Sequence, residues 1–218
     1  MNDKKKISNK HYREFLDNGI IQTINVEHLD KAMLNIKGVR GYYIEEGKAL
    51  LSLLYYTGAR PNELLRMVVP CIEHSHRRVI IRVPQSKGGL ARKIYLDDKK
   101  KYVNTILKYH DSLPDGMHMF YHYANCYKRK IITKKGISKE RKEISNKLRY
   151  YIKKWFDDVF EESITTYYLR HNRFSKMAES GADLSDIRLV KGSKTENSIF
   201  PYLHMSAKKA NQIAKIID

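Results

Sequence analysis

The stretch "TTYYLRHNRFSKMAESG", from Thr165 to Gly181, has the periodicity of an amphipathic helix. Intervals of four, three and one residues place on one face Arg170, Phe174, Met177 and Ala178. Thr165 or Thr166 is the expected N-cap, and Gly181 is the expected terminator. The pattern therefore predicts a helix that carries an arginine on its buried face.

The inward position of Arg170 requires a partner for its charge. An unpaired charge inside a protein costs several kcal/mol, so the guanidinium needs either a carboxylate of the protein or a phosphate of a ligand. The alternative to a ligand is a structural salt bridge, and this helix alone leaves both open.

A second arginine follows a glycine turn in "YYTGARPNELLRM", Tyr55 to Met67. The preceding run is apolar and predicts a buried helix that ends at Gly58. Pro61 fits the first turn of the next helix, which places Arg60 at its start. Arginine's planar fork can hold two phosphate oxygens, whereas the alternative for Arg60 is a solvated loop residue.

A β-hairpin is predicted in "RRVIIRVPQSKGGLARKIYL", Arg77 to Leu96, because β-branched runs flank "SKGG". Lys87 lies at or beside its turn, where the alternative role is to keep an edge strand soluble. Helical spacing recurs over residues 25–34, 97–110, 144–160, 183–190 and 206–218. In the first of these, the predicted apolar stripe is Val26, Leu29, Met33 and Leu34. The fold class expected is α+β, mainly α-helical with one small antiparallel sheet or hairpin.

The chain has 218 residues, with 42 Lys and Arg against 24 Asp and Glu, which gives a net charge of +18. This field favours polyanions, above all nucleic acid, although a merely basic protein is the alternative. No apolar run approaches the ~20 residues of a membrane span, and the charged N-terminus lacks a secretory signal, so a cytoplasmic, intracellular protein is expected. Residues 1–24 are a polar basic lead-in or linker remnant, and 25–218 form the main domain.

Metals and cofactors are not expected. Cys71 and Cys126 have no paired spacing, which predicts reduced thiols and neither a disulfide framework nor a zinc site. The sequence holds no Walker loop, no acidic cluster suited to two magnesium ions and no HExxH.

Four boxes together resemble the tyrosine recombinase and phage integrase family. "YYTGARPNELLRM" is similar to the T-G-x-R-x-x-E-L box, "SKGGLARKIYL" to the hairpin with its turn lysine, and "YYLRHNRFSKMAESGADL" to the H-x-L-R-H box. "IFPYLH", Ile199 to His204, resembles the I-Y-T-H nucleophile box. Arg170 and Tyr202 are 32 positions apart, an interval typical of the family. Each box alone is weak evidence for the family. Four boxes in the same order, over roughly residues 25 to 210, are a strong indication of it.

The resemblance implies the catalytic-domain fold of this family and gives roles by position. Arg60 and Arg170 would hold the scissile phosphate, Lys87 would contact DNA and act as general acid, and Tyr202 would be the nucleophile. His171 would orient the phosphate or assist proton transfer, and a histidine satisfied inside the fold is the alternative. Pro201 predicts an irregular segment around the tyrosine, away from the arginines when DNA is absent.

Two positions depart from the family pattern. Tyr167 stands where the box has its first histidine, and Ser193 falls where a later histidine is expected. Lys191 or Lys194 would supply the missing positive charge, and Tyr167 can donate a hydrogen bond to a phosphate oxygen. The departures suggest a divergent branch, such as integrases of archaeal viruses and plasmids, or a weakened catalyst.

The implied function is a site-specific DNA recombinase of a mobile element that cleaves and rejoins strands through a 3′-phosphotyrosyl intermediate. Its partners would be double-stranded DNA at attachment sites and further copies of the chain in a tetramer, with the last helix docking in trans. A type IB topoisomerase-like enzyme and a weakened, DNA-binding relative are the alternatives.

Overall fold

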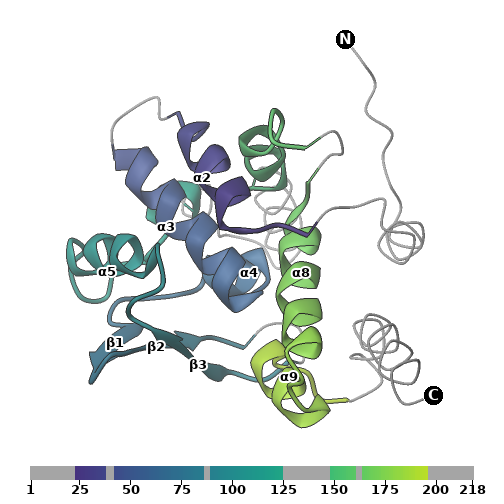
Figure 1. Ribbon diagram of the computed structural model, residues 1–218. Helices are drawn as coiled ribbons and strands as arrows, with labels where there is room; N and C mark the ends of the chain where they lie inside the picture. Colours follow the sequence, from purple (N-terminus) through teal and green to yellow (C-terminus); the bar gives the residue numbers. More distant parts are fainter. Residues whose placement is uncertain (1–22, 38–41, 86–88, 125–147, 161–163, 196–218) are drawn as a thin grey trace, which may run out of the picture.

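The computed structural model describes residues 23–37, 42–85, 89–124, 148–160 and 164–195 (Figure 1). These residues form a mainly helical α+β fold with one antiparallel sheet, as the sequence predicts. The helices are α2 (Val26–Leu34), α3 (Tyr42–Thr57), α4 (Pro61–Leu64), α5 (Val103–Asp111), α6 (Tyr121–Ala124), α8 (Thr166–Glu179) and α9 (Leu184–Lys191). The strands are β1 (Ile72–Ser75), β2 (Arg78–Val83) and β3 (Arg92–Asp97). A further helical stretch spans residues 148–155.

Helix α3 runs through the core and contacts α5 and α8 on different sides (Figure 1). Its apolar run is fully buried, with Leu50, Leu51, Leu53 and Leu54 at most 1% exposed. Gly58 has φ +59 and donates its amide to the Leu54 carbonyl at 3.1 Å, which confirms the predicted stop. A Cβ at this glycine would lie 3.1 Å from the Phe174 ring, so α8 packs directly on the turn.

The sheet has three strands in the order β1-β2-β3, so the predicted hairpin is confirmed but incomplete. One face is buried through Val79 and Ile81 of β2 and Ile94 and Leu96 of β3. Strand β1 escaped the sequence analysis because only Ile72 of its four residues is buried, which leaves no apolar alternation to detect.

Asn25 is the N-cap of helix α2, and its side chain forms a capping box with His28. The predicted apolar stripe is partly wrong, because Leu34 is 80% exposed. Leu34 lies about 140° around the helix from Leu29, and the buried side is completed by Ala32 instead. The core positions of this helix therefore follow Leu29, Ala32 and Met33.

Helix α8 begins at the predicted cap, since the Thr165 hydroxyl accepts a hydrogen bond from the Tyr168 amide. It ends at Glu179, and Gly181 with φ +80 turns the chain into α9. Gly192, with φ +66, then ends α9 beside β3 (Figure 1). The arginine-bearing helix is therefore joined by short turns to an element that contacts the sheet.

Among the described residues, no helix has the length and apolar character that crossing a membrane requires.

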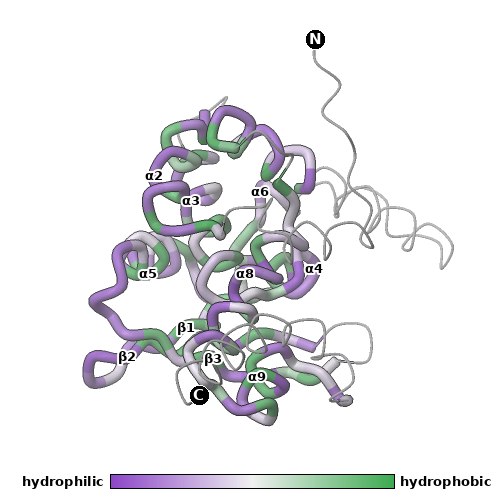
Figure 2. The backbone as a smooth tube through the Cα atoms, turned by 45° about the vertical axis from the view of Figure 1, so that its right-hand side comes forward, coloured by the Kyte–Doolittle hydropathy of each residue, from purple (hydrophilic) through white to green (hydrophobic). Residues whose placement is uncertain are grey.

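The turn between β1 and β2 is strongly hydrophilic and lies at the opposite end of β2 from the loop that leads to β3 (Figure 2).

Candidate functional site

Arg170 is buried, with 5% of its surface exposed, as its helical spacing predicts. One Nη atom donates to the Gly58 carbonyl, and the other donates to the Lys191 carbonyl at 3.0 Å. Its guanidinium carbon lies 4.8 Å from the centre of the Phe174 ring. Arg170 thus joins the turn after α3 to the end of α9, and these contacts are with carbonyl and ring groups of the protein.

Arg60 is the N-cap of α4, directly before Pro61, which confirms the predicted helix start. Its amide donates to Glu63 Oε2 at 2.8 Å, and its Nη1 lies 3.0 Å from Glu63 Oε1. The Arg60 side chain remains 44% exposed, whereas that of Glu63 is 1% exposed. The guanidinium is therefore anchored by a buried carboxylate and still faces solvent, unlike a freely solvated loop residue.

Glu63 also binds a second arginine, which the sequence analysis did not single out. Arg92 Nη2 lies 2.8 Å from Glu63 Oε2, and Arg92 Nε donates to the Val190 carbonyl at 2.6 Å. The Arg92 side chain is only 5% exposed. This pair ties the start of β3 to α4 and α9, and so places Arg60, Arg92 and Arg170 around one region.

The pKa of Glu63 reflects this surrounding of cations. Burial by itself raises the pKa, but the hydrogen bond and charge of Arg92, the Arg60 amide and the charge of Arg170 together lower it below the ordinary 4.5. Glu63 is therefore an ionised carboxylate at neutral pH.

Two signals in the sequence could have identified the pair. Glu63 stands three residues after the N-cap, at the capping-box position, in the quoted T-G-x-R-x-x-E-L pattern. Arg92 alternates with Ile94 and Leu96 along β3, which puts all three on the inward face. A charged residue at an inward strand position indicates a buried partner.

His171 and Tyr167 lie one turn apart on α8, with ring centres separated by 6.0 Å. His171 is 2% exposed, and its Nδ1 lies 3.1 Å from the Ser175 hydroxyl. Tyr167 is half-buried. The histidine is thus held inside the fold next to Arg170, and its role toward a phosphate stays a prediction.

The last residue of α9 and the residues that follow it lie beside the end of the β2–β3 loop. Lys191 is buried and supplies the carbonyl that Arg170 binds, while Lys194 is exposed. The Ser193 hydroxyl donates to the Thr195 carbonyl at 3.2 Å. The Leu90 amide donates to the Gly192 carbonyl at 3.1 Å. This hydrogen bond holds the segment that follows the predicted turn lysine against the end of α9.

Two predicted site residues fall outside the described residues. These are Lys87 in the β2–β3 loop and the predicted nucleophile Tyr202, and the predicted C-terminal helix lies outside them as well. The structure therefore brings together Arg60, Arg92 and Arg170 around Glu63, and it pairs His171 with Tyr167 on α8. The positions of Lys87 and Tyr202 stay predictions.

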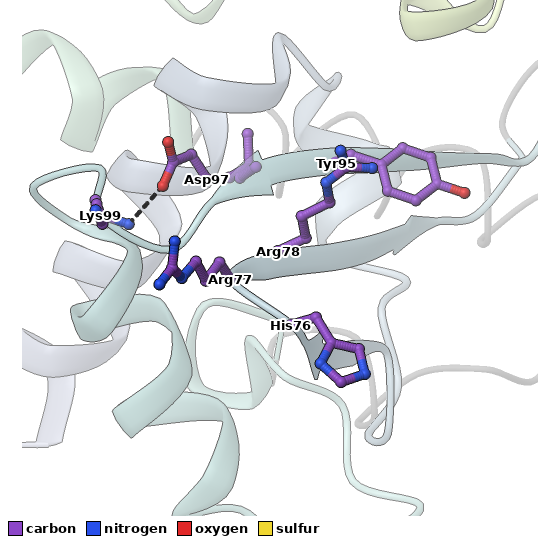
Figure 3. A pocket seen from close by; sticks show the side chains of 7 residues that line it. His76, Arg77, Arg78, Tyr95, Asp97 and Lys99 are labelled. Carbon is purple, nitrogen blue, oxygen red and sulfur yellow. Dashed lines mark hydrogen bonds between the residues drawn. The ribbon is translucent and has the colours of Figure 1, made fainter.

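Two surface cavities open on the sheet. One, of about 590 Å³, lies next to the site and is lined in part by Arg66, Arg82 and Arg92. The other, of about 460 Å³, lies at the β1–β2 turn, where Figure 3 shows Arg77, Arg78 and neighbouring polar side chains around it.

In the described ranges, no group of three or more His, Cys, Asp or Glu side chains could hold a metal ion.

Comparison with known proteins gives consistent matches. Residues 26–209 match the phage integrase family. The fold resembles the XerH site-specific recombinase bound to difH substrate in a pre-cleavage complex, with TM-score 0.55, 18% identity and coverage of 87% of this chain and 52% of that one. It also resembles the XerA recombinase, with TM-score 0.61, 15% identity and coverage of 88% and 65%.

A third solved structure is the Tn1549 transposon integrase in complex with circular intermediate DNA, with TM-score 0.53, 15% identity and coverage of 88% and 67%. This chain therefore spans about half to two thirds of the solved chains it resembles. No curated protein matches the sequence significantly.

Proposed function

Because the chain belongs to the phage integrase family, we propose that it is the catalytic domain, over residues 25–218, of a site-specific DNA recombinase of a mobile element. It would cleave and rejoin DNA strands through a 3′-phosphotyrosyl intermediate, with Tyr202 as nucleophile. The observation that carries this proposal is the pair of arginines at the Gly58 turn. Arg170 binds the Gly58 carbonyl, and Arg60 follows two residues later with an anchored but solvent-facing guanidinium.

The geometry suits a phosphodiester in its transition state. Charge that develops on the non-bridging oxygens is best met by fixed donors, and losing one such donor typically costs ~10² to 10³ in rate. Arg60 is held by Glu63, and Arg170 is held by two carbonyls, so neither has to reorganise when the charge develops. Arg60 would grip the phosphate from the solvent side and Arg170 from the protein side.

Proton transfer completes the proposed chemistry. A tyrosine has a pKa near ~10, so the cationic surroundings must favour the Tyr202 phenolate or accept its proton. Lys87 would protonate the leaving 5′-oxygen, and His171 would orient the phosphate. Tyr167, Ser193, Lys191 and Lys194 are the candidates to replace the two histidines that the family pattern would supply. The phosphotyrosyl ester keeps the energy of the broken bond, so rejoining needs no nucleotide cofactor.

The partners we propose are double-stranded DNA at attachment sites and other copies of the chain, assembled as a tetramer on DNA inside the cell. The net charge of +18 supports the first of these. Binding should weaken steeply with salt, since each neutralised phosphate releases counterions.

The test is a suicide substrate that traps a covalent protein–DNA adduct. The wild-type chain should form the adduct, and Tyr202→Phe should form none while its DNA affinity stays unchanged. A variant at an exposed tyrosine of β3 that is outside the proposed chemistry, Tyr95→Phe, should behave as wild type. An adduct that persists in Tyr202→Phe would show that another residue is the nucleophile.

Supercoil relaxation of an arbitrary plasmid would instead favour a type IB topoisomerase-like enzyme. Intact affinity without cleavage of any substrate would indicate a DNA-binding relative.

A further inference from the structure

Helix α8 carries a second arginine, Arg173, in addition to Arg170. Arg173 is half-buried, and its stem packs on the Gly58 turn, where a Cβ would lie 3.3 Å from its Cβ and Cγ. Its Nε is completely buried and has no hydrogen-bond partner among the described residues. Arg173 therefore lies beside the same turn that Arg170 binds, and its buried Nε makes no hydrogen bond there with the described residues.

Lys176, one turn later, brings a second positive charge to the same region. Its Nζ donates to the Ile24 carbonyl at 2.6 Å and lies 3.4 Å from the Tyr55 hydroxyl. Burial lowers the pKa of Lys176, the charge of Glu179 opposes this, and the charge of Arg173 adds to the lowering. Burial likewise lowers the pKa of Arg173, which only the nearby Tyr55 hydroxyl opposes.

No carboxylate within the described ranges forms an ion pair with Arg173 or with Lys176. Two adjacent cations that are partly withdrawn from water repel each other, and the charge of Glu179 offsets this only at Lys176, not at Arg173. Among the described residues this arrangement is unfavourable, and an anion that binds there would make it favourable. Arg92 differs from Arg173 in this respect, because Arg92 has Glu63 as its counter-ion.

The position relative to Arg170 suggests which anion fits. Three residues along a helix correspond to a rise of about 4.5 Å, so Arg170 and Arg173 project from adjacent positions of α8. Both arginines pack against Gly58, Arg170 through its carbonyl and Arg173 through its Cα side. A strand held at Arg170 would thus bring a neighbouring phosphate toward Arg173.

We propose that Arg173, supported by Lys176, binds a second backbone phosphate of the DNA strand, next to the phosphate that Arg60 and Arg170 hold. This inference rests on the proposed function. Helix α8 would then contact two successive phosphates of one strand. Arg173 would also supply part of the positive charge that the two absent histidines of the family pattern would have provided.

The discriminating variant is Arg173→Met, which keeps much of the apolar stem and removes the charge. If the charge awaits a ligand, removing it relieves repulsion in the free protein, so the urea midpoint of unfolding should stay the same or rise. DNA affinity should fall about tenfold, and the slope of log affinity against log salt should decrease in magnitude by about 0.9, the value for one phosphate contact.

The probe is a short fluorescein-labelled DNA duplex of arbitrary sequence, titrated at several salt concentrations. Arg78→Met is the matched control, because Arg78 is an exposed arginine at the far end of β2 (Figure 3). It should leave the affinity nearly unchanged.

Each other outcome has a distinct meaning. A lower urea midpoint with an unchanged salt slope would overturn the inference, because Arg173 would then stabilise the free protein without making a phosphate contact. An unchanged slope and an unchanged midpoint would also overturn it. A wild-type protein that binds no DNA would instead refute the proposed function itself.

Discussion

Replacing Glu63 by glutamine removes the charge from the carboxylate that links Arg60 to Arg92. Glu63→Gln keeps the size of the side chain and one oxygen acceptor, so the packing around it changes little. Arg92 keeps its buried position and has an Nη1 that already lacks a hydrogen-bond partner among the described residues. The substitution would therefore leave an uncompensated buried guanidinium.

Breaking a buried ion pair by removing one partner typically costs about 3 to 5 kcal/mol. Because glutamine still accepts one hydrogen bond, we expect the lower end, about 3 kcal/mol in the free energy of unfolding. For a chain of this size, that corresponds to a fall in Tm of about 6 to 12 °C. The control is Glu73→Gln, which removes the charge from an exposed pair with Arg82 and should cost less than about 1 kcal/mol.

Urea unfolding at several pH values measures the effect. The folded-state pKa of Glu63 is lowered, so its contribution is fully present above the unfolded-state pKa near 4.5 and is lost as pH falls through the folded-state value. The difference between wild type and Glu63→Gln should therefore be constant from pH 6 to 8 and shrink in acid. A cost below about 1 kcal/mol at neutral pH, equal to that of the control, would refute the reasoning.

Three further predictions concern other parts of the chain. Burial raises the pKa of Cys71 to about 12, so in a Cys126→Ser background the native protein should react with a thiol reagent far more slowly than the urea-unfolded protein; equal rates would contradict its burial. Gly58→Ala should lower the free energy of unfolding by about 1 to 3 kcal/mol, measured in urea, because φ is +59 and the new Cβ would meet Phe174 at 3.1 Å; a neutral effect would show that the turn can relax. Deleting the residues after Ser206 should disrupt assembly on DNA, measured by native gel shift, more than it weakens affinity, and the reverse result would argue against docking of the last helix in trans.

The sequence alone determined the features that depend on near neighbours. The period of apolar residues predicted α3, α5 and α8, and the turn residues Gly58 and Pro61 fixed where one helix ends and the next begins. The inward position of Arg170 followed from its spacing to Phe174 and Ala178. These predictions were confirmed because helix periodicity and capping depend on residues only a few positions apart, which a short stretch of sequence contains.

Only the tertiary structure decided which groups from distant stretches meet. Arg170 binds Gly58, 112 residues away, and Arg92 binds Glu63, 29 residues away. Neither partner can be read from local periodicity, because the pairing depends on how α4, α8, α9 and the sheet pack together. Strand β1 was missed for a similar reason, since its edge position leaves only Ile72 buried and its order comes from pairing with β2. Arg60 and Arg170 could thus be named from sequence as candidates, but Glu63 and Arg92, and the anchoring by a buried carboxylate and two backbone carbonyls, came only from the packed fold.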